Sequence, residues 1–304
     1  MPPKLNLKKV RFHDALATEP EPRPTTIQTN VPVGTQWHNN SCAYDAVITI
    51  LFNIWRDDPD TTTDDWHEFH CDMLDSLSQA FHRHDSMQVV RSAPSSVSRQ
   101  FTLEQIRDFF RRRLARISPE FTFGRYASVH CIFEHFLQTN DPVIVADIAC
   151  PNGHPVDRNR LTTRNAEIIL FGRPGLGLQG YLDDFAVPLH SKCPTCDTNL
   201  LRKSTFAQAP PLLVFDLSNN FDCQSLDQVL KIACQGSQIS YDLRGVIYFD
   251  NQHFTERVIT NTGLVWYHDG MFTGRSLVYE SNNVSSIVTE RAVMAIYRRE
   301  SPTS

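Results

Sequence analysis

The pattern of apolar and polar residues divides the chain into a helical first part and a β-rich second part. Residues 36–140 have the pattern of helices, and the run over 46–55 is too apolar for a surface helix. Residues 142–220 alternate β-rich runs with cysteine-containing turns, and residues 221–300 supply further strands. The pattern therefore predicts an α+β protein whose first long helix is buried.

A second amphipathic helix is predicted just after residue 100. Thr102 and Gln105 form a capping-box pattern at its start. An apolar stripe follows, made of Ile106, Phe110, Leu114 and Ile117. The other face of this helix carries five arginines: Arg107, Arg111, Arg112, Arg113 and Arg116. We expect that face to be solvated, and the alternative is a surface that binds an acidic partner.

Cys42 is the candidate nucleophile of the chain. It follows a short polar loop and opens the apolar helix, so its thiol is expected in the first helical turn. Unpaired N–H groups and the positive partial charge of a helix N-terminus favour the thiolate form of a cysteine. Gln36, Asn39 and Asn40 carry amides that could face a developing oxyanion. The alternative is a buried, inert cysteine that opens a core helix.

A hairpin near the C-terminus supplies the partners that such a nucleophile needs. Residues 252–260 and 264–269 are β-rich and flank an Asn/Thr/Gly turn. His253 lies at the start of the first strand and Asp269 at the end of the second, so an antiparallel pairing places them side by side. Together with Cys42 they match a nucleophile, a base and a carboxylate that orients the base.

Two short cysteine motifs in the middle of the chain predict a metal site. Cys193 and Cys196 lie in a Cys-Pro-Thr-Cys turn, and Cys150 and His154 form a Cys-x3-His segment. Tetrahedral zinc takes four sulfur or nitrogen ligands, and two such turns can provide them. The alternatives are a redox-active cysteine pair and a ribbon that has lost its metal.

Composition favours an intracellular enzyme, in the cytoplasm or the nucleus. A chain of 304 residues can build a substantial core, and it contains neither an apolar run of membrane-spanning length nor a signal-peptide core. We therefore expect no membrane partner. Eight cysteines in so long a chain do not indicate a disulfide scaffold. Four are expected to be free thiols: Cys71, Cys131, Cys223 and Cys234.

Six segments together resemble the ubiquitin-specific protease family of papain-like cysteine peptidases. Residues 39–45 are similar to its cysteine box, and three segments are similar to its histidine box: 241–248, 253–255 and 265–269. Residues 210–217 resemble the strand that follows the family's zinc-binding fingers, and residues 292–299 resemble its last palm strand. The resemblance covers residues 36–300, and the stretches between these segments follow it in order and spacing.

The resemblance implies a papain-like fold with a helical thumb, a β palm and zinc-ribbon fingers. It divides the chain into a flexible tail over 1–35 and a catalytic domain over 36–300. Within that domain, residues 36–141 would form the cysteine helix and thumb, 142–220 the fingers, and 221–300 the palm. The implied partner is ubiquitin or a ubiquitin-like modifier, joined by its C-terminal glycine to a lysine of a conjugate.

Three positions depart from the family pattern. Gln252 stands where the family usually has glycine before the histidine, and Ala43 where it usually has an aromatic residue. Trp37 occupies the usual position of the oxyanion amide, so Gln36, one residue earlier, is the candidate donor. These departures indicate a divergent member of the family.

Three alternatives to a deubiquitinase remain at this level. One is a peptidase of the same fold that acts on another substrate. The second is a catalytically silent module that binds ubiquitin or another protein. The third is a zinc-ribbon protein that binds nucleic acid, which the net charge of −5 disfavours. The presence of all three triad residue types favours the enzyme, whereas Gln252 and the shifted amide favour the silent module.

Overall fold

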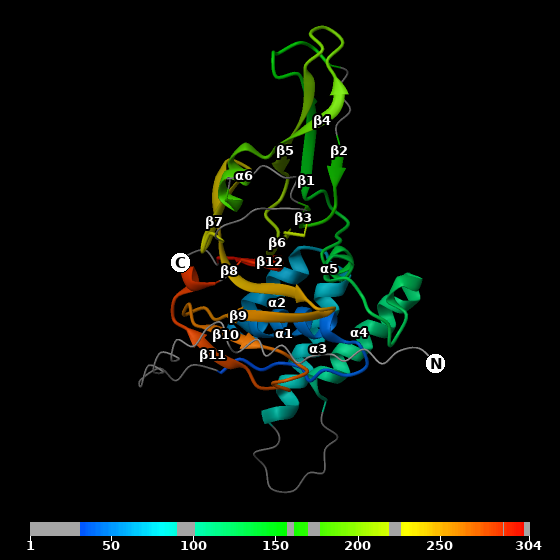
Figure 1. Ribbon diagram of the computed structural model, residues 1–304, viewed down its shortest axis with the longest axis vertical. Coiled ribbons are helices and arrows are strands. Elements are labelled where there is room, and N and C mark those ends of the chain that lie inside the picture. Colours follow the sequence, from blue (N-terminus) through cyan, green and yellow to red (C-terminus); the bar gives the residue numbers. More distant parts are fainter. Residues whose placement is uncertain are drawn as a thin grey trace, which may run out of the picture.

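The computed structural model describes residues 31–89, 101–156, 161–169, 177–218, 226–287 and 289–300. In Figure 1, helices α1–α5 gather beside the lower strands of a large sheet, and strands β1, β2, β4 and β5 extend away from this body. The predicted α+β class is therefore confirmed as a mixed architecture with a large sheet. Residues 1–30 of the predicted tail over 1–35 lie outside the described residues, and so does Cys223, which we expect to be a free thiol.

Among the described residues, four helices pack against the first one, and the last helix packs against β7. The helices are α1 (Cys42–Asp57), α2 (Pro59–Glu68), α3 (Asp72–Val89), α4 (Leu103–Ile117), α5 (Val129–Phe136) and α6 (Leu178–Asp184), with short 3-10 turns at Pro119–Phe121 and Val284–Ser286. Helix α1 is buried from Cys42 to Trp55, as its apolar sequence predicts. The capping box that opens α4 is present, with Thr102 and Gln105 each bonded to the other's backbone N–H.

Among the described residues, twelve strands form one sheet. They are β1 (Ile144–Ala149), β2 (Leu161–Thr163), β3 (Glu167–Ile169), β4 (Ala186–Lys192), β5 (Asn199–Phe206), β6 (Leu212–Asp216), β7 (Val229–Cys234), β8 (Ser237–Asp250), β9 (His253–Ile259), β10 (Val265–His268), β11 (Val278–Ser281) and β12 (Ala292–Arg299). The main order is β11-β10-β9-β8-β7-β5-β1-β2, and β12 joins β8 to β6. Because β5 and β7 pair at a single position, the extended strands and the body share one sheet.

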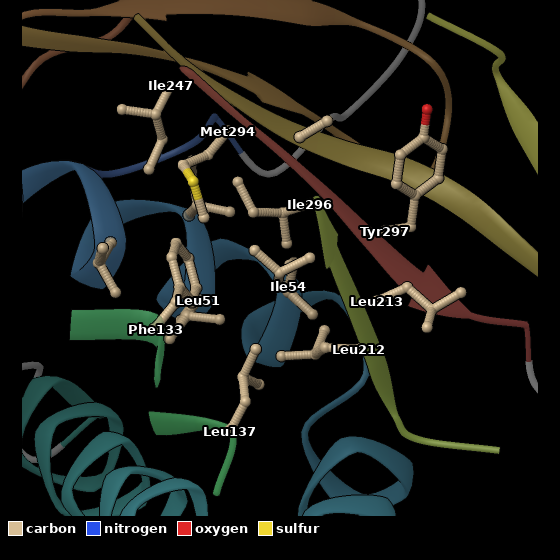
Figure 2. Packing of buried hydrophobic residues seen from close by; sticks show 14 of the residues in the cluster. Leu51, Ile54, Phe133, Leu137, Leu212, Leu213, Ile247, Met294, Ile296 and Tyr297 are labelled. Carbon is tan, nitrogen blue, oxygen red and sulfur yellow. The ribbon is translucent and has the colours of Figure 1, made fainter. Parts of the chain in front are cut away.

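The core lies between α1 and the body of the sheet. Figure 2 shows Leu51 and Ile54 of α1 facing side chains from α5, β6, β8 and β12, among them Met294 and Ile296. The approach is close at Gly245 of β8, where an added Cβ would lie 2.6 Å from Cγ2 of Ile50. This packing holds the N-terminus of α1 at a set position relative to β8 and β9.

Two expectations from the sequence are corrected by the structure. Residues 31–35 do not belong to a free tail, because Val33 bridges to Ser276 and Thr35 is buried. The arginine face of α4 is not solvated along its length, because Arg107 and Arg111 are each 1% exposed, whereas Ile117 of the predicted apolar stripe is 57% exposed. Among the described residues, no helix has the length and apolarity that crossing a bilayer requires.

Candidate active site

Cys42 lies at the first position of α1, as the sequence predicts. Its side chain is 4% exposed, and Ser41 is the residue before the helix. The Ser41 hydroxyl accepts a 2.9 Å hydrogen bond from the His38 N–H and donates one of 2.6 Å to Asp45. These bonds hold the loop against the helix, so that the thiol projects from a rigid N-terminus.

The predicted hairpin brings His253 and Asp269 together. His253 is the first residue of β9, and β10 ends one residue before Asp269. Nε2 of His253 lies 2.9 Å from Oδ1 of Asp269. The same carboxylate oxygen accepts the N–H groups of Met271 and Phe272, at 2.9 and 3.2 Å. Asp269 is therefore fixed by its own turn, and it in turn fixes the imidazole ring.

The His253 imidazole also contacts the cysteine. Burial lowers the pKa of His253, but hydrogen bonds to Asp269 and Cys42, together with their charges, raise it to about 10. Hydrogen bonds from His253 and from the turn lower the pKa of Asp269, although burial opposes this. Because Nε2 is engaged by Asp269, Nδ1 is the ring nitrogen left for the thiol. The three side chains thus form a chain from sulfur to imidazole to carboxylate.

Gln252 has an unusual backbone conformation directly before the histidine. It forms the two-residue turn between β8 and β9 with Asn251, and their φ angles are +63° and +49°. Such a turn needs positive φ at both positions, which glycine adopts most easily and asparagine next. Gln252 therefore adopts a backbone conformation that favours glycine.

The turn after β10 rests on the loop before Cys42. The N–H of Trp37 donates a 2.9 Å hydrogen bond to the carbonyl oxygen of Gly270. An added Cβ at Gly270 would lie 2.8 Å from the carbonyl oxygen of Thr35, so only glycine fits this contact. The two halves of the site are in this way joined through the backbone.

Beneath this turn lies a buried ion pair that sequence reasoning missed. His268 and Glu256 face each other across β9 and β10, with 0% and 1% exposure. Nδ1 of His268 lies 2.5 Å from the Glu256 carboxylate, and its Nε2 lies 2.8 Å from the carbonyl oxygen of Gly274. Burial lowers the pKa of His268, but the charge of Glu256 raises it more. His268 therefore stabilises the turn, with both ring nitrogens engaged by Glu256 and Gly274.

A second buried ion pair lies under the cysteine loop. Arg107 of α4 donates a 2.7 Å bond to Asp45, which also accepts the hydroxyls of Thr35 and Ser41. Burial raises the pKa of Asp45 to about 6, although Arg107 lowers it. The sequence signal was a lone acid within the apolar run after Cys42, but its partner could not be found by spacing.

The three candidate oxyanion amides have different environments. Gln36 is exposed, and its backbone N–H and carbonyl oxygen bind Glu104 and Arg107. The Asn40 side chain donates a 2.9 Å bond to the carbonyl oxygen of Gly124, so that amide is engaged. Asn39 is exposed beside the same glycine. The structure therefore places none of these three side-chain amides at Cys42.

The four predicted metal ligands come together at the far end of the extended strands. Donor atoms of Cys150, His154, Cys193 and Cys196 all lie within 4.8 Å of one another. The Cys150 sulfur is 3.5 Å from Nδ1 of His154 and 3.6 Å from the Cys196 sulfur. The sulfur of Cys193 is 3.9 Å from the same nitrogen. The cluster could hold a metal ion.

These spacings fit tetrahedral zinc. Zn–S bonds of about 2.3 Å and Zn–N bonds of about 2.0–2.1 Å place ligand atoms roughly 3.5–3.8 Å apart. Asn152 and Thr198 lie 3.4 Å from the Cys196 sulfur. Hydrogen bonds from Thr198 lower the pKa of Cys196 to about 5. A stabilised thiolate with neighbouring polar groups is what a metal site requires.

Comparison with known proteins identifies the fold. No protein-family model and no curated protein matches the chain. Solved structures do match: the SAGA DUB module of Ubp8, Sgf11, Sus1 and Sgf73 bound to monoubiquitin has a TM-score of 0.57 at 11% identity, covering 91% of this chain and 72% of that one. The module bound to ubiquitin aldehyde has a TM-score of 0.55 at 12% identity, covering 88% and 70%.

A yeast SAGA DUB module with a substituted Sgf73 gives a TM-score of 0.50 at 13% identity, over 91% of this chain and 71% of that one. At these identities the likeness establishes the fold. The chain therefore has a fold like that of the ubiquitin-specific proteases, which confirms the coarse form of the predicted resemblance.

Proposed function

We propose that this protein is a cysteine-dependent deubiquitinase that cleaves the bond after the C-terminal glycine of ubiquitin or a ubiquitin-like modifier. One observation carries the proposal. In a fold like that of the ubiquitin-specific proteases, Cys42 at the N-terminus of a buried helix interacts electrostatically with an imidazole that Asp269 holds at 2.9 Å. A buried structural cysteine needs no such partner.

Each of the three residues Cys42, His253 and Asp269 has a distinct role in the reaction. The Cys42 thiolate attacks the carbonyl carbon of the terminal glycine, and the carbonyl oxygen becomes an oxyanion. Protonated His253 then gives its proton to the leaving lysine amine, and the C–N bond breaks. In the second half, His253 takes a proton from water, the resulting hydroxide attacks the thioester, and Cys42 leaves. Asp269 keeps the ring oriented throughout.

Two kinds of group would stabilise the oxyanion. Backbone N–H groups at the start of α1 lie at the nucleophile, and the Gln36 amide would swing in from its exposed position. These donors lie in the loop before Cys42 and in the first turn of α1.

The same fold suggests roles for the rest of the chain. Residues 36–141 would serve as the thumb, 142–220 as fingers closed by a zinc ion on the four-ligand cluster, and 221–300 as the palm. Zinc would be structural, joining two turns that have only a small core of their own. The partners would be ubiquitin, or a similar modifier, and its conjugates inside the cell.

A catalytically silent module that binds ubiquitin is the second candidate. It is favoured by Gln252, which holds a strained positive φ beside the histidine, and by Trp37 at the usual amide position. In such a module the body and extended strands would still hold a protein partner.

A ubiquitin probe that bears a C-terminal electrophile separates the two. The wild-type chain should form a covalent adduct through Cys42, Cys42→Ser should form none, and Cys131→Ser should react like the wild type. A chain that binds unmodified ubiquitin but forms no adduct would be a silent module. A chain that does neither acts on another substrate or none.

A further inference from the structure

Three carbonyl oxygens of the loop before Cys42 face inward, onto two buried arginines of α4. Nη1 of Arg107 donates a 2.7 Å hydrogen bond to the carbonyl oxygen of Gln36. Arg111 donates to the carbonyl oxygens of Asn39 and His38, at 2.7 and 3.4 Å. Both guanidinium side chains are 1% exposed. Buried guanidiniums that bind backbone carbonyls have an orienting role, because each bond selects one direction of the peptide plane.

The direction of the Asn39 carbonyl determines where the next N–H points. A trans peptide is planar, so its N–H points opposite to its C=O. With the Asn39 oxygen held by Arg111, the N–H of Asn40 points away from the arginines. Asn39 and Asn40 have φ angles of +53° and +57°, a region that residues other than glycine enter at a cost. The arginine bonds therefore hold a conformation that the loop would not favour by itself.

The N–H groups that result are without partners. Among the described residues, the backbone N–H groups of Asn40, Ser41 and Cys42 have no hydrogen-bond acceptor. Asn40 at positive φ is followed by Ser41 with φ −90° and ψ −1°. A left-handed residue followed by a right-handed one turns successive N–H groups toward one point, which makes a concavity suited to an anion. The last of these N–H groups belongs to the nucleophile itself.

The charges of the two arginines are balanced differently. Arg107 pairs with Asp45 at 2.7 Å and with Asp108 at 2.9 Å. Arg111 lies 3.7 Å from Asp108 and packs against the rings of Tyr44 and Phe123. Within the described part of the chain Arg111 is thus the less neutralised cation, and it lies directly behind the loop. Its charge favours a negative charge on the other side of the Asn39–Asn40 peptide.

We propose that Arg111 is a positioning residue, which orients the Asn39–Asn40 peptide so that the N–H groups of Asn40 and Cys42 receive the oxyanion. The inference rests on the proposed function and deepens it. It makes the backbone the main donor in a chain that has Trp37 at the family's amide position. Arg107 supports the same loop at an earlier peptide group, through the carbonyl oxygen of Gln36.

The test compares Arg111→Lys and Arg111→Met with the matched controls Arg113→Lys and Arg113→Met. Arg113 lies on the same helix and donates a 2.8 Å bond to Ser76, away from the loop. Four quantities are measured: kcat and KM on a fluorogenic C-terminal amide of ubiquitin, affinity for ubiquitin aldehyde, affinity for unmodified ubiquitin, and the alkylation rate of Cys42 by iodoacetamide. The aldehyde adds the thiol across its C=O bond and so presents an oxygen at the oxyanion position, whereas alkylation does not.

Loss of an oxyanion donor lowers kcat by about 100-fold or more in other enzymes. We expect Arg111→Met to lower kcat and aldehyde affinity together by about that factor. KM, binding of unmodified ubiquitin and the alkylation rate should stay within about twofold of wild type. Arg111→Lys keeps the charge but cannot span two carbonyl oxygens, so it should rescue kcat only in part. The Arg113 variants should match wild type.

A second variant tests the inference in case the Arg111 variants fail to fold. Replacing Asn40 by its α-hydroxy-acid analogue removes the N–H and leaves Arg111 in place, and it should cause the same loss of kcat and aldehyde affinity. A wild-type kcat in that ester variant, or in Arg111→Met, would overturn this inference but leave the proposed function standing. So would equal losses of ubiquitin binding, alkylation rate and melting temperature. A wild-type chain that neither cleaves the amide nor binds the aldehyde would overturn the proposed function, and this inference with it.

Discussion

The backbone N–H of Trp37 donates a 2.9 Å hydrogen bond to the carbonyl oxygen of Gly270. This bond joins the loop before Cys42 to the turn that begins at Asp269. The nucleophile and its base therefore come from opposite ends of the chain, and this bond is one of the contacts that join their loops, together with the bridge between Val33 and Ser276. Changes on either side of the Trp37–Gly270 bond should be felt at the site.

Cys42 should be the most reactive of the cysteines outside the metal cluster. Burial raises the pKa of Cys71 and of Cys234, and burial together with Glu120 raises that of Cys131 to about 11. These thiols are therefore protonated at neutral pH and react slowly. Iodoacetamide followed by peptide mapping should modify Cys42 first, although Cys131 is the more exposed. Modification of Cys42 no faster than Cys131 would remove the main support for catalysis.

Replacement of His253 and of His268 should damage the protein in different ways. His253→Ala should lower kcat by about 100-fold or more, since it removes the general acid and base, and should leave the melting temperature near wild type. His268→Ala should lower the melting temperature, because Glu256 would remain buried without its partner. The measurements are kcat and thermal unfolding. If His268→Ala alone destroyed activity without affecting stability, the assignment of the base would be wrong.

Asp269→Asn should reduce activity less than His253→Ala. An asparagine oxygen could still accept the His253 ring and the N–H groups of Met271 and Phe272, so the ring would stay oriented. Asp269→Ala should reduce activity more than Asp269→Asn, because it leaves all three donors unpaired. Steady-state kinetics of the three variants tests the order. Equal kcat values for Asp269→Ala and wild type would show that the carboxylate does not orient the base.

Activity should decline at alkaline pH as His253 loses its proton. The pKa of His253 is raised to about 10, mainly by Asp269 and Cys42 against the effect of burial. Its protonated form contributes stability fully below the unfolded histidine value of about 6.5, and this contribution is lost as pH rises toward about 10. Both the rate and the melting temperature should fall over that interval. Asp269→Asn removes one negative charge, so it should move the alkaline decline of the rate to lower pH. An unchanged profile in Asp269→Asn would contradict this coupling.

The cysteine–histidine cluster should bind one zinc ion per chain. Elemental analysis should find it, and Cys193→Ser or Cys196→Ser should release it and lower the melting temperature, because the metal joins two turns with a small core of their own. The alkylation rate of Cys42 should not change in these variants, and Cys131→Ser should keep the metal. Metal-free wild-type protein would show that the cluster has no structural ion. Loss of zinc in Cys42→Ser would make Cys42 a ligand and leave the proposed enzyme without a nucleophile.

Sequence alone could predict the features that depend on short-range patterns. The capping box at Thr102, the hairpin from His253 to His268 and the helix that starts at Cys42 are each encoded within a few residues, and the structure contains all three. Two turns with metal-ligand spacing also predicted a cluster, because geometry within each turn already aims its side chains. Side-by-side placement of His253 and Asp269 followed from antiparallel pairing.

Only the tertiary structure could decide which polar groups are buried and which groups they pair with. Arg107 and Arg111 occur in an arginine-rich helix face, and spacing within α4 does not distinguish them from Arg112 and Arg116, which are exposed. They are buried because Asp45 and the carbonyl oxygens of the cysteine loop are there to receive them. The His268–Glu256 pair became visible only once strand register was known. The sequence thus determined the chemical groups of the site, whereas burial of charge depends on partners distant in sequence, which packing alone brings together.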